Sequence, residues 1–287
     1  MYIKTKLLSV AKMAGVYVGW YGFLTIFGLL ISIIFTREFR NSDIWAIVGT
    51  SIMLAVTIAY NFILLKIFAK KEKPKCGFAF ENKWFTHFIY SSALGAVCML
   101  IIWLIAMLFN EFSVKINVLD FKTISYILIQ LVAFLLVGFF EEIPTRGFTA
   151  YFGRTGGKWF VAIIISLVFA FSHGSTPFNV LFYINLLIWS IIAFMLTWIS
   201  GDLWSAIGFH FSWNFVQGGI FGVAVSGTRP RGLLISEYDT GNIINGGQVG
   251  LEGSIICTFI LIILFILLFY LIRNNKINND TNVKWLL

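Results

Sequence analysis

The amino-acid sequence predicts an all-α polytopic membrane protein with about eight transmembrane helices. Hydrophobic residues make up 59% of the 287 residues and charged residues 12%, and the mean hydropathy is +0.88. Soluble globular domains contain about twice that charged fraction. Long apolar runs recur along the chain, and inside a bilayer only helices or closed barrels satisfy the backbone hydrogen bonds. The formal net charge of +8 therefore indicates membrane topology, and we expect a lipid bilayer and no nucleic acid as a partner.

The first predicted span, residues 16–35, is too long for the core of a signal peptide, and no small-residue cleavage site follows it. Residues 70–75 carry four lysines and must lie outside the hydrocarbon. The glycine-rich residues 226–253 predict a loop before the last span. The eight predicted spans are residues 16–35, 44–68, 84–109, 124–140, 159–173, 178–199, 203–225 and 255–272.

We expect three regions along the chain. Residues 1–123 contain three spans, and residues 124–225 contain the fourth to seventh spans, in which the candidate catalytic residues lie. Residues 226–287 contain the glycine-rich loop, the last span and a tail.

The distribution of lysine and arginine predicts the orientation of these spans. Fifteen of the 21 basic residues fall on the side that holds both termini and the segments 66–83 and 146–158. The other side holds Arg37, Arg40, Lys115, Lys122, Arg229 and Arg231. Cytoplasmic segments of membrane proteins carry the excess of lysine and arginine. We therefore predict a multi-pass protein of the cell membrane with both termini in the cytoplasm.

Two adjacent carboxylates, Glu141 and Glu142, end the fourth apolar run, and Arg146 follows them. An ionisable group inside a membrane span costs about 2.5–3.5 kcal/mol on insertion scales and usually marks a functional site. In a helix, Glu142 and Arg146 stand at i, i+4 on one face and can pair, whereas Glu141 points away from the arginine. Pro144 lacks a backbone N–H and predicts a kink beside the carboxylates. Glu142 is thus expected to be structural and Glu141 to be available for chemistry.

Two of the three histidines lie within predicted spans. His173 follows Phe169 at i+4, and His210 precedes Asn214 at i+4, so each pair shares one helix face. A buried histidine is more often a hydrogen-bonded packing residue than a ligand or a base. Here two such histidines lie in one membrane region together with Glu141, for which no ion-pair partner is predicted. This combination favours a functional site. His87, at the edge of the third span, is interpreted as an interfacial residue without a partner.

These three motifs, each on its own helix and in this order, resemble the CPBP family. Its members are the CAAX-protease and bacteriocin-processing proteins, also called Abi, which are intramembrane endopeptidases. The resemblance covers roughly residues 131–254 and includes Arg146-Gly147-Phe148, Gly208-Phe209-His210 and Trp213-Asn214-Phe215. One departure is the pair Pro144-Thr145, because members of the family usually carry a bulky apolar residue just before the arginine.

The resemblance implies a role for each residue of these motifs. Glu141 would activate a water molecule with the help of His173, while His210 and Asn214 would stabilise the oxyanion. Glu142 and Arg146 would brace the site. The resemblance leaves two alternatives for a cofactor: zinc or another divalent metal held by Glu141, His173 and His210, or a metal-free glutamate–histidine site.

The substrate implied is a peptide or a membrane protein, cleaved in CAAX-type processing, peptide maturation or bacteriocin self-immunity. Glu141 lies 17 residues after Ile124, about 26 Å of helix. With cytoplasmic termini, that depth predicts cleavage near the cytoplasmic face.

Two other functions are compatible with ionisable groups in a membrane. One is an ion-coupled transporter, although no duplicated halves with matching broken helices are found. The other is a non-catalytic scaffold or immunity protein, against which the intact motif residues argue. The three cysteines are widely separated and predict neither a disulfide framework nor a zinc knuckle.

Overall fold

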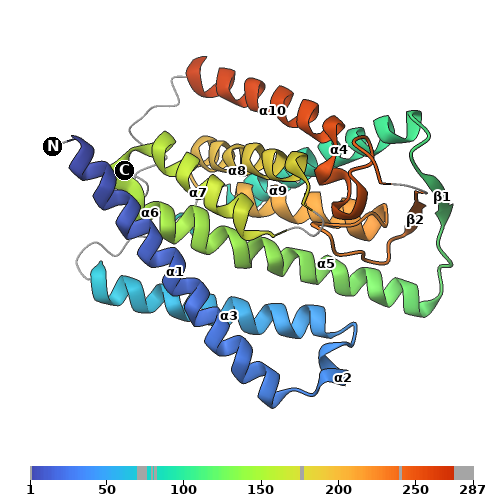
Figure 1. Cartoon of the computed structure of the whole chain (residues 1–287), viewed down its shortest axis with the longest axis horizontal. Coiled ribbons are helices and arrows are strands. Elements are labelled where there is room, and N and C mark those ends of the chain that lie inside the picture. The colour runs from blue at the N-terminus through green and yellow to red at the C-terminus, as the bar shows by residue number, and fades with distance from the viewer. Residues whose placement is uncertain are drawn as a thin grey trace.

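The computed structural model describes residues 2–69, 76–78, 80, 83–174, 178–238 and 241–274. Within these residues the chain forms a bundle of long helices that run roughly along one axis (Figure 1). The predicted all-α polytopic fold is confirmed. The lysine-rich linker 70–75 and the tail 275–287, both predicted to be cytoplasmic, lie outside the described residues.

Six described helices are long and apolar enough to cross a membrane, and α7 is apolar but shorter. The count of eight spans therefore stays a prediction. The main helices are α1 (Tyr2–Ile34), α3 (Trp45–Phe68), α4 (Trp84–Leu108), α5 (Phe121–Glu142), α7 (Lys158–Ser172), α8 (Val180–Ser200), α9 (Trp204–Asn214) and α10 (Ile255–Asn274). Shorter helices are α2 (Arg37–Arg40), α6 (Ala150–Gly153), η2 (Arg154–Gly156), η4 (Gly247–Val249) and η5 (Leu251–Gly253).

Helix α5 begins three residues before the predicted span and ends at Glu142, and the chain stays helical past Pro144. The side chain of Asp120 accepts a hydrogen bond from the Thr123 N–H at 2.7 Å and so caps the helix start. After Glu142 the chain forms a π-helix, η1 (Ile143–Thr149), in which the Ala150 N–H reaches the Thr145 carbonyl. Proline cannot donate to the α-helical ladder, and a wider turn accommodates it where a kink was expected.

The predicted seventh span, residues 203–225, is only partly helical. Helix α9 ends at Asn214 and continues as a π-helix, η3 (Phe215–Ile220). The chain then folds back, with the Val223 N–H bonded to the Gln217 carbonyl. This segment is therefore too short to cross a membrane as one straight helix.

Helix α9 occupies the centre of the bundle and packs against α4, α5 and α8. Glycines allow the closest of these approaches. A Cβ atom on Gly208 of α9 would lie 2.4 Å from the Phe88 carbonyl of α4, and one on Gly95 of α4 would lie 2.6 Å from the Phe209 carbonyl. Small residues let the backbones of membrane helices approach in this way. Helices α1 and α3 lie along one side of the bundle. Helix α3 packs on α5, and α1 packs on α3.

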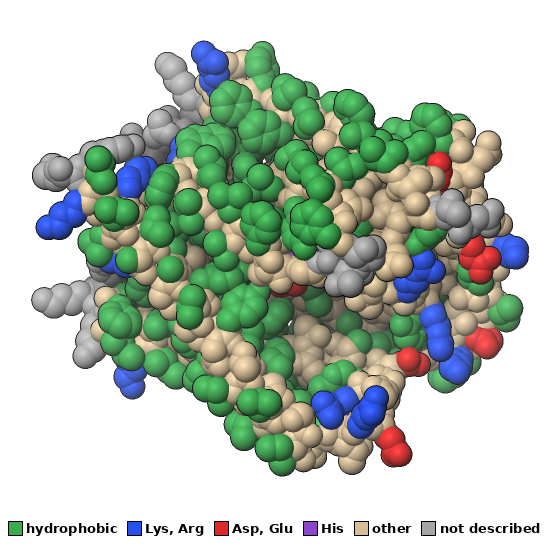
Figure 2. All heavy atoms as spheres, in the orientation of Figure 1, with side chains coloured by type: hydrophobic (Ala, Val, Ile, Leu, Met, Phe, Trp, Pro, Cys, Tyr) green, Lys and Arg blue, Asp and Glu red, His purple; other side chains and the backbone are tan. Residues whose placement is uncertain are grey.

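Two opposite ends of the bundle can be distinguished. Helix α1 begins and α10 ends at one end, which we call the termini side (Figure 1). The opposite end, the hairpin side, carries an antiparallel pair of strands, β1 (Ser113–Ile116) and β2 (Leu234–Glu237), which joins the segment after α4 to the glycine-rich loop. Figure 2 shows lysine and arginine gathered toward the two ends, with mainly hydrophobic side chains between them. This distribution is typical of a membrane protein.

His87 has a partner that no motif in the sequence indicated. Its Nδ1 lies 2.5 Å from Oδ2 of Asp202. The second carboxylate oxygen of Asp202 accepts a hydrogen bond from the Trp204 N–H at 3.0 Å and so holds the start of α9. The sequence did not indicate this pair because 115 residues separate its members.

Candidate active site

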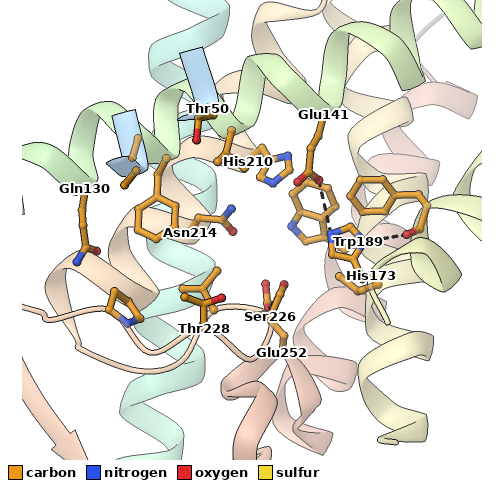
Figure 3. A pocket seen from close by; sticks show the side chains of 18 of the residues that line it. Thr50, Gln130, Glu141, His173, Trp189, His210, Asn214, Ser226, Thr228 and Glu252 are labelled. Carbon is orange, nitrogen blue, oxygen red and sulfur yellow. Dashed lines mark hydrogen bonds and ion pairs between the residues drawn. The ribbon is translucent and has the colours of Figure 1, made fainter. Parts of the chain in front are cut away.

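The four predicted catalytic residues line one cavity of about 320 Å³ (Figure 3). Glu141 extends from α5, His173 follows the end of α7, and His210 and Asn214 extend from α9. Trp189 of α8 also faces this cavity. Three helices, α5, α7 and α9, thus bring the three motifs to one site, and α8 adds Trp189 to its wall.

Glu141 and His173 form the accessible pair of this site. Oε2 of Glu141 lies 3.5 Å from Nε2 of His173, and the two side chains are 21% and 17% exposed. Nδ1 of His173 donates to the Phe169 carbonyl at 2.8 Å, since a carbonyl oxygen can only accept. Nε2 therefore faces the carboxylate of Glu141 at ion-pair distance.

Glu142 and Arg146 form the ion pair that their i, i+4 spacing predicts. The guanidinium donates to Oε1 of Glu142 at 3.0 Å, and both side chains are fully buried. Arg146 also donates to the hydroxyl and the carbonyl of Ser190, and its Cζ lies 4.4 Å from the centre of the Phe169 ring. The side chains of Glu142 and Arg146 are thus shielded from solvent, whereas that of Glu141 is partly exposed.

Glu142 has a second partner that the sequence did not predict. Its Oε1 lies 2.8 Å from Nδ1 of His210. A carboxylate paired with an arginine is ionised and can only accept, so Nδ1 of His210 is the donor. The neutral imidazole then has a bare Nε2, and only the imidazolium form could donate a hydrogen bond from that atom.

Asn214 lies one helical turn after His210 on α9, and both side chains line the cavity. In Figure 3 the Asn214 amide points into the space below His210. The ring of Trp189 packs edge-on against His210, with 4.7 Å between ring centres. The amide supplies N–H donors to the cavity whatever the protonation state of His210.

Glu252 is a cavity residue that sequence reasoning missed. It belongs to η5 in the glycine-rich loop, and its carboxylate accepts from the Trp213 indole at 3.2 Å and from the N–H and hydroxyl of Ser226 at 2.7 and 3.0 Å. Burial raises the pKa of Glu252, and the hydrogen bonds from Ser226 offset part of that rise. The one available signal was a carboxylate next to the start of an apolar span.

The loop that carries Glu252 is held by Asn185 of α8. The amide nitrogen of Asn185 donates to the carbonyls of Glu252 and Ser254 at 2.7 and 2.9 Å, and its oxygen accepts from the Thr258 hydroxyl at 2.7 Å. The position of Glu252 therefore depends on contacts between α8 and the start of α10.

The described residues do not form the three-ligand metal site that was one alternative. Among them, no group of three or more His, Cys, Asp and Glu side chains is arranged to hold a metal ion. Nδ1 of His210 is bonded to Glu142, and Nδ1 of His173 to a carbonyl. Glu141, His173 and His210 thus surround a cavity without converging on one point.

Comparison with known proteins gives one family. Residues 123–216 match the family described as type II CAAX prenyl endopeptidase Rce1-like. No curated protein and no solved structure matches the chain. The matched segment, less than half of the chain, contains the three motifs and ends before Glu252. The match confirms the resemblance to CPBP proteins: residues 123–216 are similar to the Rce1-like family of type II CAAX prenyl endopeptidases.

Proposed function

We propose that this chain is an intramembrane endopeptidase in which Glu141 and His173 activate a water molecule. The observation that carries this proposal is the pairing of Glu141 with His173 at the wall of a cavity that Asn214 and His210 also line. A base, its partner and a hydrogen-bond donor around one cavity are the parts that hydrolysis of a peptide bond requires.

In the first half of the reaction, Glu141 accepts a proton from water while the oxygen attacks the scissile carbonyl carbon. The carbonyl oxygen becomes an oxyanion, to which the Asn214 amide donates. One such donor is typically worth about 3–4 kcal/mol in the transition state. His210 adds a second donor only as an imidazolium, because Glu142 accepts the proton on its Nδ1.

In the second half, the proton that Glu141 accepted passes to the nitrogen of the leaving group, directly or through His173. The carbon–nitrogen bond then breaks and leaves one new carboxyl and one new amino terminus. Glu142 and Arg146 take no part in these transfers. They fix the position of His210 and the turn of helix that carries Glu141.

The proposed substrate is a peptide or a segment of a membrane protein, since the cavity lies among membrane-spanning helices. CAAX-type processing, peptide maturation and bacteriocin self-immunity are the settings that this chemistry fits. A metal-free site is proposed, because the described side chains supply no converging ligand set.

The experiment compares membranes from cells that express the wild type, Glu141→Gln or Glu237→Gln. Glu237 lies on exposed strand β2, away from the cavity, and serves as the matched control. New peptide termini are identified by mass spectrometry. Glutamine keeps the shape of Glu141 but cannot accept the proton, so the termini found with wild type and Glu237→Gln should disappear, a loss of roughly 10²–10⁴-fold in rate.

Identical termini with wild type and a folded Glu141→Gln protein would contradict the proposal. That result would favour the non-catalytic scaffold or the ion-coupled transporter, neither of which needs Glu141 as a base for hydrolysis.

A further inference from the structure

Trp189 contributes a polar group to the wall of the cavity that none of the three motifs includes. Its side chain comes from the middle of α8, lines the cavity and is 4% exposed. Among the described residues, no group accepts a hydrogen bond from its indole nitrogen, which is itself buried. An indole nitrogen can only donate, and a buried indole usually finds an acceptor. The Trp189 N–H is therefore a free donor at the cavity.

Other tryptophans of the bundle show why this donor is unusual. The indole of Trp20 donates to a threonine hydroxyl of α3 at 2.8 Å, and that of Trp213 donates to Glu252 at 3.2 Å. The indole of Trp198, also on α8, is buried without an acceptor, but it packs edge-on against an aromatic ring of α7 and does not line the cavity. Among the described tryptophans, Trp189 alone combines a free N–H with a place in the wall of this cavity.

Aromatic neighbours hold the Trp189 ring in a fixed orientation. The ring stacks on Phe169 and Phe209, with ring centres 5.9 and 5.4 Å apart and planes 12° and 26° from parallel. The plane of the His210 ring stands at 75° to it. In Figure 3 the indole nitrogen lies on the side of the ring toward Asn214. A donor that packing holds in place needs no reorganisation when charge develops beside it.

The proposed reaction leaves a position for such a donor. An oxyanion can accept more than one hydrogen bond, and the Asn214 amide can donate to it in every protonation state of the site. Neutral His210 cannot serve as the second donor, because its Nε2 is bare while Nδ1 is bonded to Glu142. A neutral N–H beside Asn214 completes the oxyanion site without protonation of His210.

We infer that the Trp189 N–H donates a hydrogen bond to the oxyanion together with Asn214, which makes Trp189 a further catalytic residue. When the water oxygen bonds to the scissile carbon, the carbonyl π electrons move to the carbonyl oxygen, and the two N–H groups stabilise the charge that forms there. When the carbon–nitrogen bond breaks, the carbonyl re-forms and that charge disappears. Trp189 keeps its proton throughout. This inference deepens the proposed function and rests on it for the reaction.

The test compares two tryptophans of one helix. Trp189→Phe removes the N–H and keeps an aromatic ring in the wall. Trp198→Phe is the matched control, because it removes a buried N–H without an acceptor from the same helix, outside the cavity. The full chain is reconstituted in lipid, and a quenched fluorescent peptide carries a cleavage site that the Glu141-dependent termini define.

We expect kcat per mole of folded protein to fall roughly 10²–10³-fold in Trp189→Phe, as for the loss of one oxyanion donor. KM should change far less, because the ground-state carbonyl carries little charge. Trp198→Phe should keep the wild-type kcat.

Isosteric replacement separates the hydrogen bond from packing. Benzothienylalanine at position 189 keeps the shape of the indole and has sulfur in place of the N–H, so it should reproduce the loss of kcat. Fluorotryptophan at the same position keeps the N–H and should restore kcat to near the wild-type value.

Three outcomes would contradict the inference. Wild-type kcat in Trp189→Phe, with Glu141→Gln inactive, would overturn it and leave the proposed function standing. Loss of activity in Trp189→Phe, with full activity of the benzothienylalanine protein, would assign Trp189 a packing role and overturn it as well. Absence of Glu141-dependent cleavage in the wild type would refute the proposed function and the inference together.

Discussion

Oε1 of Glu142 lies 2.8 Å from Nδ1 of His210, a residue 68 positions later in the chain. The same oxygen accepts from Arg146 at 3.0 Å. One buried carboxylate oxygen therefore neutralises the arginine and also selects the tautomer of the histidine. Glu142 connects the stability of the helix turn that bears Glu141 to the chemistry of α9.

Replacement of Glu142 by glutamine should lower both stability and turnover. The change leaves the buried Arg146 without a counter-ion, and loss of one member of a buried ion pair costs about 3–5 kcal/mol. It also removes the charge that holds His210 with its proton on Nδ1. The measurements are thermal unfolding in detergent and activity per mole of folded protein.

Ser190→Ala is the matched control for this change, because it removes a neutral partner of Arg146 and leaves the ion pair intact. Ser190→Ala should lower the free energy of unfolding by about 1 kcal/mol. Equal unfolding temperatures for wild type and Glu142→Gln would show that the pair does not stabilise the site.

Asn214→Asp should lower turnover more than Asn214→Ala. Alanine removes one donor to the oxyanion, which typically costs roughly 10²–10³-fold in rate. Aspartate replaces the donor by an acceptor and adds repulsion to that loss. Apparent substrate affinity should change far less, since the ground-state carbonyl carries little charge.

The same variants distinguish the proposed site from a metal site when they are assayed with and without a chelator. The proposed chemistry predicts wild-type activity that survives chelation. Wild-type rates in Asn214→Asp, together with activity that is lost on chelation and restored by zinc, would refute the oxyanion role.

Glu252→Gln should loosen the loop that forms one wall of the cavity. Glutamine can still accept from the Trp213 indole, but its NH₂ group cannot accept from the Ser226 N–H. A buried hydrogen bond left unmade costs about 1–3 kcal/mol. Hydrogen exchange of residues 225–230 should become faster, and turnover should fall.

Ser226→Ala controls for the hydroxyl alone, because it keeps the backbone donor and the charge of Glu252. We expect a smaller change in the hydrogen exchange of residues 225–230 for Ser226→Ala than for Glu252→Gln. Unchanged exchange in Glu252→Gln would mean that the loop is held by Asn185 without help from Glu252.

His87 and Asp202 should show energetic coupling in a double-mutant cycle. The pair lies 2.5 Å apart with side chains 25% and 10% exposed, so solvent screens it only in part. We expect a coupling energy of about 1 kcal/mol from the unfolding of His87→Ala, Asp202→Ala and the double variant. Asp202→Ala alone should lower the free energy of unfolding more than His87→Ala, because Asp202 also accepts from the Trp204 N–H at the start of α9. If the unfolding free energies lost in the two single variants add up to the loss in the double variant, the contact contributes nothing to stability.

Features that depend on neighbours along the chain could be predicted from the sequence. Apolar runs predicted the membrane helices, and the i, i+4 spacing predicted the pair of Glu142 with Arg146, because a helix has a fixed repeat. The motifs around Glu141, His173 and His210 contain the four predicted catalytic residues that line the cavity, and the family match spans all three motifs. Helix ends were less certain, as the fourth and seventh spans show, since caps and π-turns depend on single residues.

Features that depend on packing appeared only in the tertiary structure. Glu142 meets His210 because α5 and α9 lie side by side, and Glu252 reaches the cavity because Asn185 holds a loop from the far end of the chain. No spacing in the sequence encodes such contacts, because they join residues whose separation is set by how whole helices assemble.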